Sequence, residues 1–215
     1  AKFVDMKPDR FGIELAPGFV DATTCAAWVA QLEAQPRQWL DGFDHERSTP
    51  EQVVRRFDSS RVTEKVDPGA LQPALDELVG RAFGTWLAPR WSCRFEWFEQ
   101  PQVLRYTAGG LYKAHADADA VDDEGRPTRV LDRDGSLLIY LNDGFTGGEL
   151  EFSNFEFRLR PRPGLLAAFP SDERYTHTAL PTLSGVRYAI VSWAHAQGRP
   201  RVRKHPPQHC IMLAG

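Results

Sequence analysis

Two histidines and one aspartate are the side chains of this sequence best suited to bind a metal ion. His115 and Asp117 lie two residues apart in a segment with the pattern of a β-strand. Because residues i and i+2 of a strand point to the same face, we expect the imidazole and the carboxylate side by side. His177, which lies between an apolar strand and a turn region, is the candidate for a third ligand. Together these residues predict one metal site.

Two histidines and one carboxylate on one side of a metal leave its other positions open to small molecules. Non-haem Fe(II) oxygenases use this ligand set, because a cosubstrate and O₂ must both reach the iron. Zinc also accepts two histidines and a carboxylate. A jelly-roll zinc hydrolase or binding module is therefore an alternative. The intact triad disfavours a third reading, a catalytically silent interaction domain.

Arg187 separates these alternatives. It begins an apolar strand in which Arg187, Ala189, Val191 and Trp193 share one face. An arginine in such surroundings is costly without an anionic partner, and its planar guanidinium suits a carboxylate best. Tyr140, in another predicted strand, offers a hydroxyl to the same carboxylate. A hydrolase has no need of a guanidinium facing the metal, so Arg187 favours the oxygenase; alone, it could equally form a structural salt bridge.

The elements that must position these residues are two helices followed by many short strands. Asp21 is a candidate cap for a first helix that ends at Pro36, and a second helix follows Pro68 and stops before Pro89. From Trp91 onward the period is that of strands. The expected strands are 93–98, 103–107, 111–116, 136–141, 149–152, 156–160, 165–169, 175–179 and 186–194. We expect an α+β fold with a double-stranded β-helix core (jelly roll, cupin-like) and flanking N-terminal helices.

The 215 residues predict a single domain. Residues 1–90 support a core at 91–196, and 197–215 form a C-terminal tail. Residues 41–66 are expected to be a lid loop that selects the substrate, and they carry Arg55, Arg56 and Arg61 as candidate substrate residues. A second long loop, 118–134, leaves directly after Asp117 and is expected to edge the site.

Charge and cysteine content exclude several classes of protein. The net charge of −3 argues against nucleic acid or an anionic membrane surface as a partner. Three widely spaced cysteines suit neither a disulfide framework nor a zinc knuckle, so we expect a cytoplasmic protein. His205 and His209 are poor metal ligands, because Pro206 and Pro207 exclude the helix that would align them. The oligomeric state is left open.

The order and spacing of the remaining motifs resemble a known family. The chain contains Arg105-Tyr106-x₃-Gly110-x-Tyr112-x₂-His115-x-Asp117, Tyr140-Leu141-Asn142, Gly147-Gly148-Glu149-Leu150-x-Phe152, Pro163-Gly164, Phe169-Pro170-Ser171, His177, Gly185-x-Arg187-Tyr188 and Trp193. This series, over roughly residues 92 to 195, resembles the prolyl 4-hydroxylase branch of the 2-oxoglutarate and Fe(II)-dependent dioxygenases.

The resemblance implies the roles of individual residues. It implies Fe(II) held by His115, Asp117 and His177, and 2-oxoglutarate bound through Arg187 and Tyr140, with Tyr106 close by. O₂ is then the second cosubstrate, and ascorbate is a candidate cofactor.

The reaction would be hydroxylation of an unactivated C–H bond, and an acidic rather than a small residue at position 117 favours it over halogenation. The implied substrate is a prolyl residue of a protein or peptide, and the alternative is a free amino acid or related metabolite.

Overall fold

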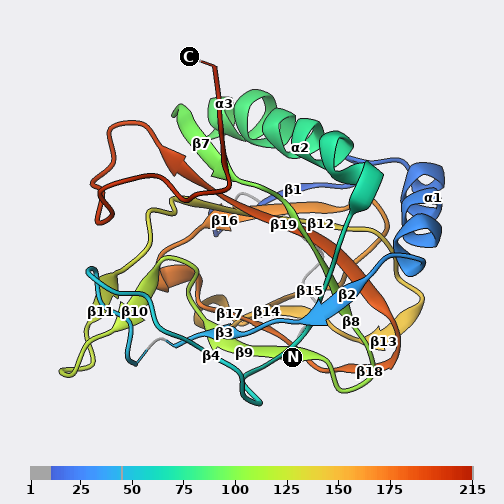
Figure 1. Cartoon of the computed structure of the whole chain (residues 1–215), viewed down its shortest axis with the longest axis horizontal. Coiled ribbons are helices and arrows are strands. Elements are labelled where there is room, and N and C mark those ends of the chain that lie inside the picture. Colours follow the sequence, from blue (N-terminus) through green and yellow to red (C-terminus); the bar gives the residue numbers. More distant parts are fainter. Residues whose placement is uncertain (1–10, 45, 215) are drawn as a thin grey trace.

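Two antiparallel β-sheets face each other in the computed structural model, which describes residues 11–44 and 46–214 (Figure 1). We call them the major and the minor sheet. The major sheet comprises β1 (Glu14–Ala16), β16 (Leu166–Pro170), β12 (Gly135–Tyr140), β19 (Arg187–Ala196), β8 (Gln102–Tyr106), β6 (Glu64–Val66) and β2 (Arg37–Trp39) in spatial order, with β7 (Phe95–Glu99) on β19 and β20 (Cys210–Met212) on β7. The minor sheet comprises β15 (Phe157–Leu159), β14 (Leu150–Phe152), β17 (His177–Ala179), β9 (Leu111–His115) and β5 (Arg61–Val62).

Three further strand pairs complete the β structure of the described residues. They are β3 (Gly42–Phe43) with β4 (Arg55–Arg56), β10 (Asp119–Val121) with β11 (Pro127–Arg129), and β13 (Phe145–Gly147) with β18 (Thr182–Gly185). The expected double-stranded β-helix with N-terminal helices is confirmed, and each of the nine expected strands corresponds to an observed one.

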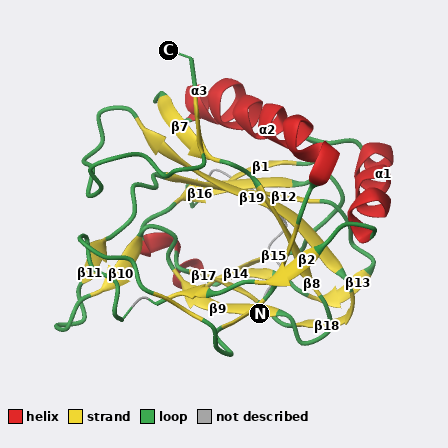
Figure 2. Cartoon of the chain, viewed as in Figure 1, coloured by secondary structure: helices red, strands yellow, loops and turns green. Residues whose placement is uncertain are grey.

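The helices cover the side of the major sheet that faces away from the minor sheet (Figure 2). They are α1 (Ala22–Glu33), α2 (Gln72–Arg81), the π-helical turn η3 (Ala82–Leu87), α3 (Ala88–Arg90) and the 3₁₀ turn η2 (Gly69–Leu71). Two further 3₁₀ turns, η4 (Ser153–Phe155) after β14 and η5 (Glu173–Tyr175) before β17, adjoin the minor sheet instead. As expected, Asp21 caps α1, since its carboxylate accepts a hydrogen bond from the Thr24 amide at 2.8 Å. Among the described residues, no helix is both long and apolar enough to cross a lipid bilayer.

Alternation along the central strands divides the buried residues into two layers. On β19, Tyr188 and Ile190 pack with the helices, whereas Ala189 packs between the sheets. On β12, Ile139 faces the helices and Tyr140 faces inward. Because side chains alternate along a strand, every second residue of β12 and β19 packs against the helices, and the residues between them point into the space between the sheets.

Three segments that the sequence predicts as loops or tail contain paired strands. Residues 41–66 hold β3 to β6, with β5 paired to β9 and β6 to β8, so this segment joins both sheets instead of forming a plain loop. Residues 118–134 contain the β10–β11 hairpin, and the C-terminal tail pairs with β7 through β20. Each of these strands has only two to three residues. Such strands are too short for an alternating pattern to be recognised.

Gly164 lies where two segments of backbone approach each other closely. Gly164 has a φ of +79°, and a Cβ atom there would overlap the carbonyl oxygen of Val20. Its own amide donates to Tyr140 O at 2.8 Å, and its carbonyl accepts from the Phe19 amide at 2.9 Å. Gly164 thus brings the segment before α1 against the end of β12.

We predict that Gly164→Ala destabilises the protein more than Gly109→Ala. Gly109 has a φ of +84°, and no atom lies near a Cβ position there. Gly109→Ala therefore measures only the free-energy cost of placing an alanine in left-handed backbone, about 1–2 kcal/mol. At Gly164 the overlap with Val20 adds to that cost. Urea denaturation of the two variants gives the comparison, and equal losses of free energy of unfolding would contradict the predicted close contact.

Candidate active site

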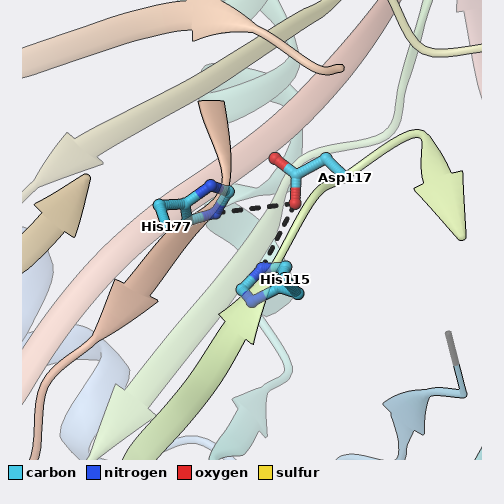
Figure 3. Close-up of side chains that lie close together, drawn as sticks. All are labelled: His115, Asp117 and His177. Atoms are coloured by element: carbon cyan, nitrogen blue, oxygen red, sulfur yellow. Dashed lines mark ion pairs between the residues drawn. The ribbon is translucent and has the colours of Figure 1, made fainter. Parts of the chain in front are cut away.

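The three expected metal ligands meet where β9 and β17 pair (Figure 3). His115 ends β9, His177 begins β17, and the two residues are register partners. Asp117 follows on the chain that leaves β9. The Nε2 atoms of His115 and His177 lie 3.3 Å and 3.6 Å from Asp117 Oδ1, and the candidate ligand atoms of all three residues lie within 4.8 Å of one another. The structure therefore brings the predicted triad together in one buried cluster.

Backbone carbonyls orient both imidazoles. His115 Nδ1 lies 2.8 Å from Lys113 O, and His177 Nδ1 lies 2.9 Å from Tyr175 O. Since a carbonyl oxygen only accepts, each Nδ1 carries the proton, and in a neutral ring the Nε2 lone pair then faces Asp117. Burial lowers the pKa of His115 to about 4, so this ring is neutral near pH 7. The imidazoles are thus arranged as metal ligands.

Asp117 is held from two directions. Its Oδ2 accepts from Ser136 Oγ at 2.6 Å, and Ser136 is in turn hydrogen-bonded to Ser171 at 2.8 Å. Its backbone carbonyl accepts from Arg133 Nη1 at 3.2 Å. Burial raises the pKa of Asp117, but His177, His115 and the Ser136 hydroxyl outweigh it and hold that pKa well below its ordinary value. The residue is therefore a carboxylate whose Oδ1 faces the histidines.

This donor set fits a divalent metal such as Fe(II). Two imidazole Nε2 atoms and one carboxylate oxygen converge on one point, and the three remaining hydrogen-bonding atoms, both Nδ1 atoms and Oδ2, are occupied by the protein. Such outer contacts set ligand orientation in metal sites. The ligands come from one side only, which leaves the cavity side open to other molecules.

Arg187 lines the same cavity, and the ring of Tyr140 packs beside its guanidinium. Arg187 is 1% exposed, and its Nε and Nη1 atoms have no hydrogen-bond partner among the described residues; neither does the Tyr140 hydroxyl. The guanidinium carbon lies 4.4 Å from the ring centroid of Tyr106 and 5.2 Å from that of Tyr140. Burial raises the pKa of Tyr140, so its hydroxyl remains a donor. These hydrogen-bond donors without an acceptor in the described residues fit a carboxylate, such as the distal carboxylate of 2-oxoglutarate.

The cavity between the sheets connects the triad with Arg187. Its lining consists of the triad with Ser136, Arg61, Arg187, Tyr106 and Tyr112, and the apolar residues Leu104, Leu137, Leu138, Leu150, Ala179, Val191 and Trp193. A mostly apolar wall with a few convergent polar groups is typical of a small-molecule site.

The three arginines of 41–66 occupy different environments. Arg61 lines the cavity, as a substrate residue should. Arg55 pairs with Asp41 at 2.8 Å and Arg56 with Asp58 at 2.6 Å; both side chains are exposed and neither lines the cavity. The structure thus brings one of the three candidates to the site and leaves the other two in ion pairs on the surface.

Sequence reasoning assigned no role to Ser136, Ser171 or Tyr112. Ser136 lies four residues before Tyr140 on a predicted strand, so the period of two could have placed both on the inner face. Tyr112 stacks on His115 with ring centroids 3.7 Å apart, although the two residues lie three apart on β9. The register shift of β9 against β17 between them inserts one extra residue into β9, which lets both rings fall on one face. No local pattern indicates Ser171, which reaches Ser136 from the end of β16.

Residues 101–195 match the family model of the 2OG-Fe(II) oxygenase superfamily. Human prolyl 3-hydroxylase 3 is 37% identical over 92 residues, which cover 38% of this chain and 12% of that protein. Prolyl 4-hydroxylase subunit alpha-2 of Gallus gallus is 28% identical over 109 residues, 47% of this chain and 20% of that protein. The chain therefore spans only a small part of these relatives' length, and the resemblance predicted from the motif order is confirmed.

Solved structures share the fold across most of the chain. The viral collagen prolyl hydroxylase of Paramecium Bursaria Chlorella virus-1 has a TM-score of 0.58 and 20% identity, and the match covers 88% of this chain and 99% of that one. A Pseudomonas putida prolyl-4-hydroxylase has a TM-score of 0.58 and 22% identity, with 89% and 96% covered. At these identities the likeness demonstrates the double-stranded β-helix fold.

We predict that Ser136→Ala weakens metal binding by about 10- to 100-fold, because Asp117 loses the hydroxyl that orients its carboxylate. Ser171→Ala is the graded control, since it removes only the hydrogen bond to Ser136 and should have a smaller effect. Anaerobic Fe(II) titration in competition with a chelator measures both. An unchanged Fe(II) affinity in a folded Ser136→Ala variant would show that Asp117 needs no such support.

Proposed function

We propose that this chain, which resembles the prolyl 4-hydroxylase branch of the 2-oxoglutarate and Fe(II)-dependent dioxygenases, is an Fe(II)- and 2-oxoglutarate-dependent hydroxylase. One observation carries the proposal. A His-Asp-His triad and a buried arginine without a carboxylate partner among the described residues line the same cavity. A zinc hydrolase would account for the triad and leave Arg187 without a role.

The triad, the Arg187–Tyr140 pair and the apolar lining then each have a defined task. His115, Asp117 and His177 hold Fe(II). Bound Fe(II) supplies the activation of O₂ that couples decarboxylation of 2-oxoglutarate, to succinate and CO₂, with insertion of one oxygen atom into a C–H bond of the substrate. Arg187 and Tyr140 bind the distal carboxylate of 2-oxoglutarate and set its direction. The apolar lining excludes water from the reacting centre.

We propose a prolyl residue of a protein or peptide as the substrate. The support comes from relatives that are prolyl 3- and 4-hydroxylases by name, and from a structural neighbour from Trichoplax adhaerens described as a prolyl hydroxylase in complex with a hypoxia inducible factor peptide fragment. A free amino acid or related metabolite is the competing substrate class. Residues 41–66 are the segment proposed to select between them, since β5 brings Arg61 to the cavity.

Two further assignments belong to the same proposal. Ascorbate as a cofactor rests on the family resemblance alone. A cytoplasmic location is supported by the three cysteines, Cys25, Cys93 and Cys210, which are all free thiols.

The proposed function is tested by succinate release from the iron-loaded chain supplied with 2-oxoglutarate, with and without prolyl peptides and free amino acids. We predict that His177→Ala abolishes both iron retention and succinate release, because one of three protein ligands is lost. Full turnover in this variant with stoichiometric iron would rule out the triad as the metal site. Succinate release that no amino-acid or peptide probe stimulates would rule out these substrates.

We predict that Arg187→Met raises the 2-oxoglutarate concentration needed for half-maximal activity by about ten- to a hundredfold. The reason is the loss of a charge-assisted hydrogen-bonded pair in a desolvated site. Tyr140→Phe, which removes one neutral donor, should shift this requirement in the same direction by less. Steady-state kinetics with varied 2-oxoglutarate give both values. If neither variant changes the requirement while remaining folded, Arg187 supports the fold instead of the cosubstrate.

A further inference from the structure

Arg61 is a second buried arginine in the cavity that has no carboxylate partner among the described residues. Two other largely buried arginines of the described residues are neutralised: Arg105 pairs with Glu64 at 2.8 Å and Arg133 with Glu99 at 2.5 Å. Arg61 is 9% exposed and forms no ion pair with any residue in the described parts of the chain. Arg187 is the other such case. Both unpaired guanidinium groups therefore lie in one place.

The position of Arg61 follows from strand pairing. Arg61 and Tyr112 are register partners of β5 and β9, so their side chains lie on the same face of the minor sheet. The guanidinium carbon lies 4.5 Å from the Tyr112 ring centroid, and the Tyr112 ring stacks on His115 at 3.7 Å. Arg61 is thus separated from a metal ligand by one aromatic ring.

The hydrogen bonds of Arg61 leave most of its charge uncompensated. Nη1 donates to the backbone carbonyl of Asp41 at 3.2 Å, whereas Nε is buried without a partner among the described residues. A neutral carbonyl offsets the desolvation of a guanidinium less than a carboxylate does. Retaining an unpaired cation here costs folding free energy unless a bound anion compensates for it.

The cosubstrate does not account for Arg61. In the proposed function one carboxylate of 2-oxoglutarate pairs with Arg187, on β19 of the major sheet, and the other end of the molecule is directed at the metal. Arg61 lies on β5, the edge strand of the opposite, minor sheet. A second anion must therefore come from the substrate.

We propose that Arg61 binds a carboxylate of the substrate, so that the enzyme selects molecules with an acidic group close to the hydroxylated carbon. This inference rests on the proposed function for the identity of the reaction. The carboxylate has two possible sources. One is the α-carboxylate of a free or C-terminal residue, and the other is an acidic side chain beside an internal prolyl residue.

The test measures binding separately from turnover. Isothermal titration of the anaerobic Fe(II)- and 2-oxoglutarate-loaded chain uses pairs of probes that differ only by a carboxylate against a carboxamide. N-acetylproline and its amide test the α-carboxylate; acetyl-Pro-Glu-amide with acetyl-Pro-Gln-amide, and acetyl-Glu-Pro-amide with acetyl-Gln-Pro-amide, test a neighbouring acidic side chain. We expect the acid of at least one pair to bind about tenfold or more tightly, and the pair that shows the preference identifies the source.

Two variants assign the preference to Arg61. Arg61→Gln should abolish it, and Arg61→Lys should retain part of it. Arg158→Gln is the matched control, because it also removes one positive charge, from an ion pair with Glu151 outside the cavity lining, and should keep the full preference. No preference in any pair, including no binding of any probe, overturns the inference. So does a preference that survives Arg61→Gln.

Stability and turnover complete the test. Since an unpaired buried charge does not stabilise the fold, Arg61→Gln should unfold at a temperature no lower than the unaltered chain without ligands. A clear fall in that temperature would assign Arg61 to the fold and overturn the inference. The same probes are then assayed in air. If the acid probes bind more tightly than their amides but no succinate is released, the proposed function is overturned and the carboxylate subsite stands. If acid and amide stimulate succinate release equally, the carboxylate subsite is overturned and the proposed function stands.

Discussion

The pairing register of β9 with β17 is the constraint on which the candidate site depends. It sets His115 opposite His177, and the chain that leaves β9 then returns Asp117 to the same point. A slip of one residue would turn one imidazole to the other face of the minor sheet, since side chains alternate along a strand. The register is in turn specified by burial, because Leu150, Phe152 and Ala179 of the same sheet pack between the two sheets. Packing of the apolar core therefore positions the candidate metal ligands.

The candidate metal site is shared between the two sheets. Its candidate ligands lie on the minor sheet or just after β9. The residues that orient Asp117 belong to the major sheet or adjoin it: Ser136 on β12, Ser171 just after β16, and Arg133 just before β12. Arg133 is itself held by Glu99 of β7 and by the ring of Trp193 of β19. A change in the distance between the sheets would thus shift the Asp117 carboxylate relative to the two histidines. The packing of the two sheets therefore controls the geometry of the candidate ligands.

Unbalanced positive charge distinguishes the cavity from the rest of the interior. Elsewhere in the described residues two largely buried arginines pair with carboxylates, Arg105 with Glu64 and Arg133 with Glu99. In the cavity Arg187 and Arg61 have no such partner within residues 11–44 and 46–214, and they belong to opposite sheets. Such unpaired donors reduce the stability of the free protein, and their cost is recovered only when anions bind. The electrostatics of the fold therefore indicate negatively charged ligands beside both arginines of the cavity.

The sequence alone determined the elements that carry a clear period: the helix capped by Asp21, the nine main strands, and the same-face placement of His115 with Asp117 and of Arg187 with Val191. These follow from local rules that act over two to four residues. Tertiary structure alone decided which strands pair. The two- and three-residue strands of 41–66, the Ser136–Ser171 support of Asp117, and the separation of Arg61 from Arg55 and Arg56 all depend on contacts between residues distant in sequence. No periodicity encodes such contacts, because they arise only when burial of the apolar faces brings the two sheets together.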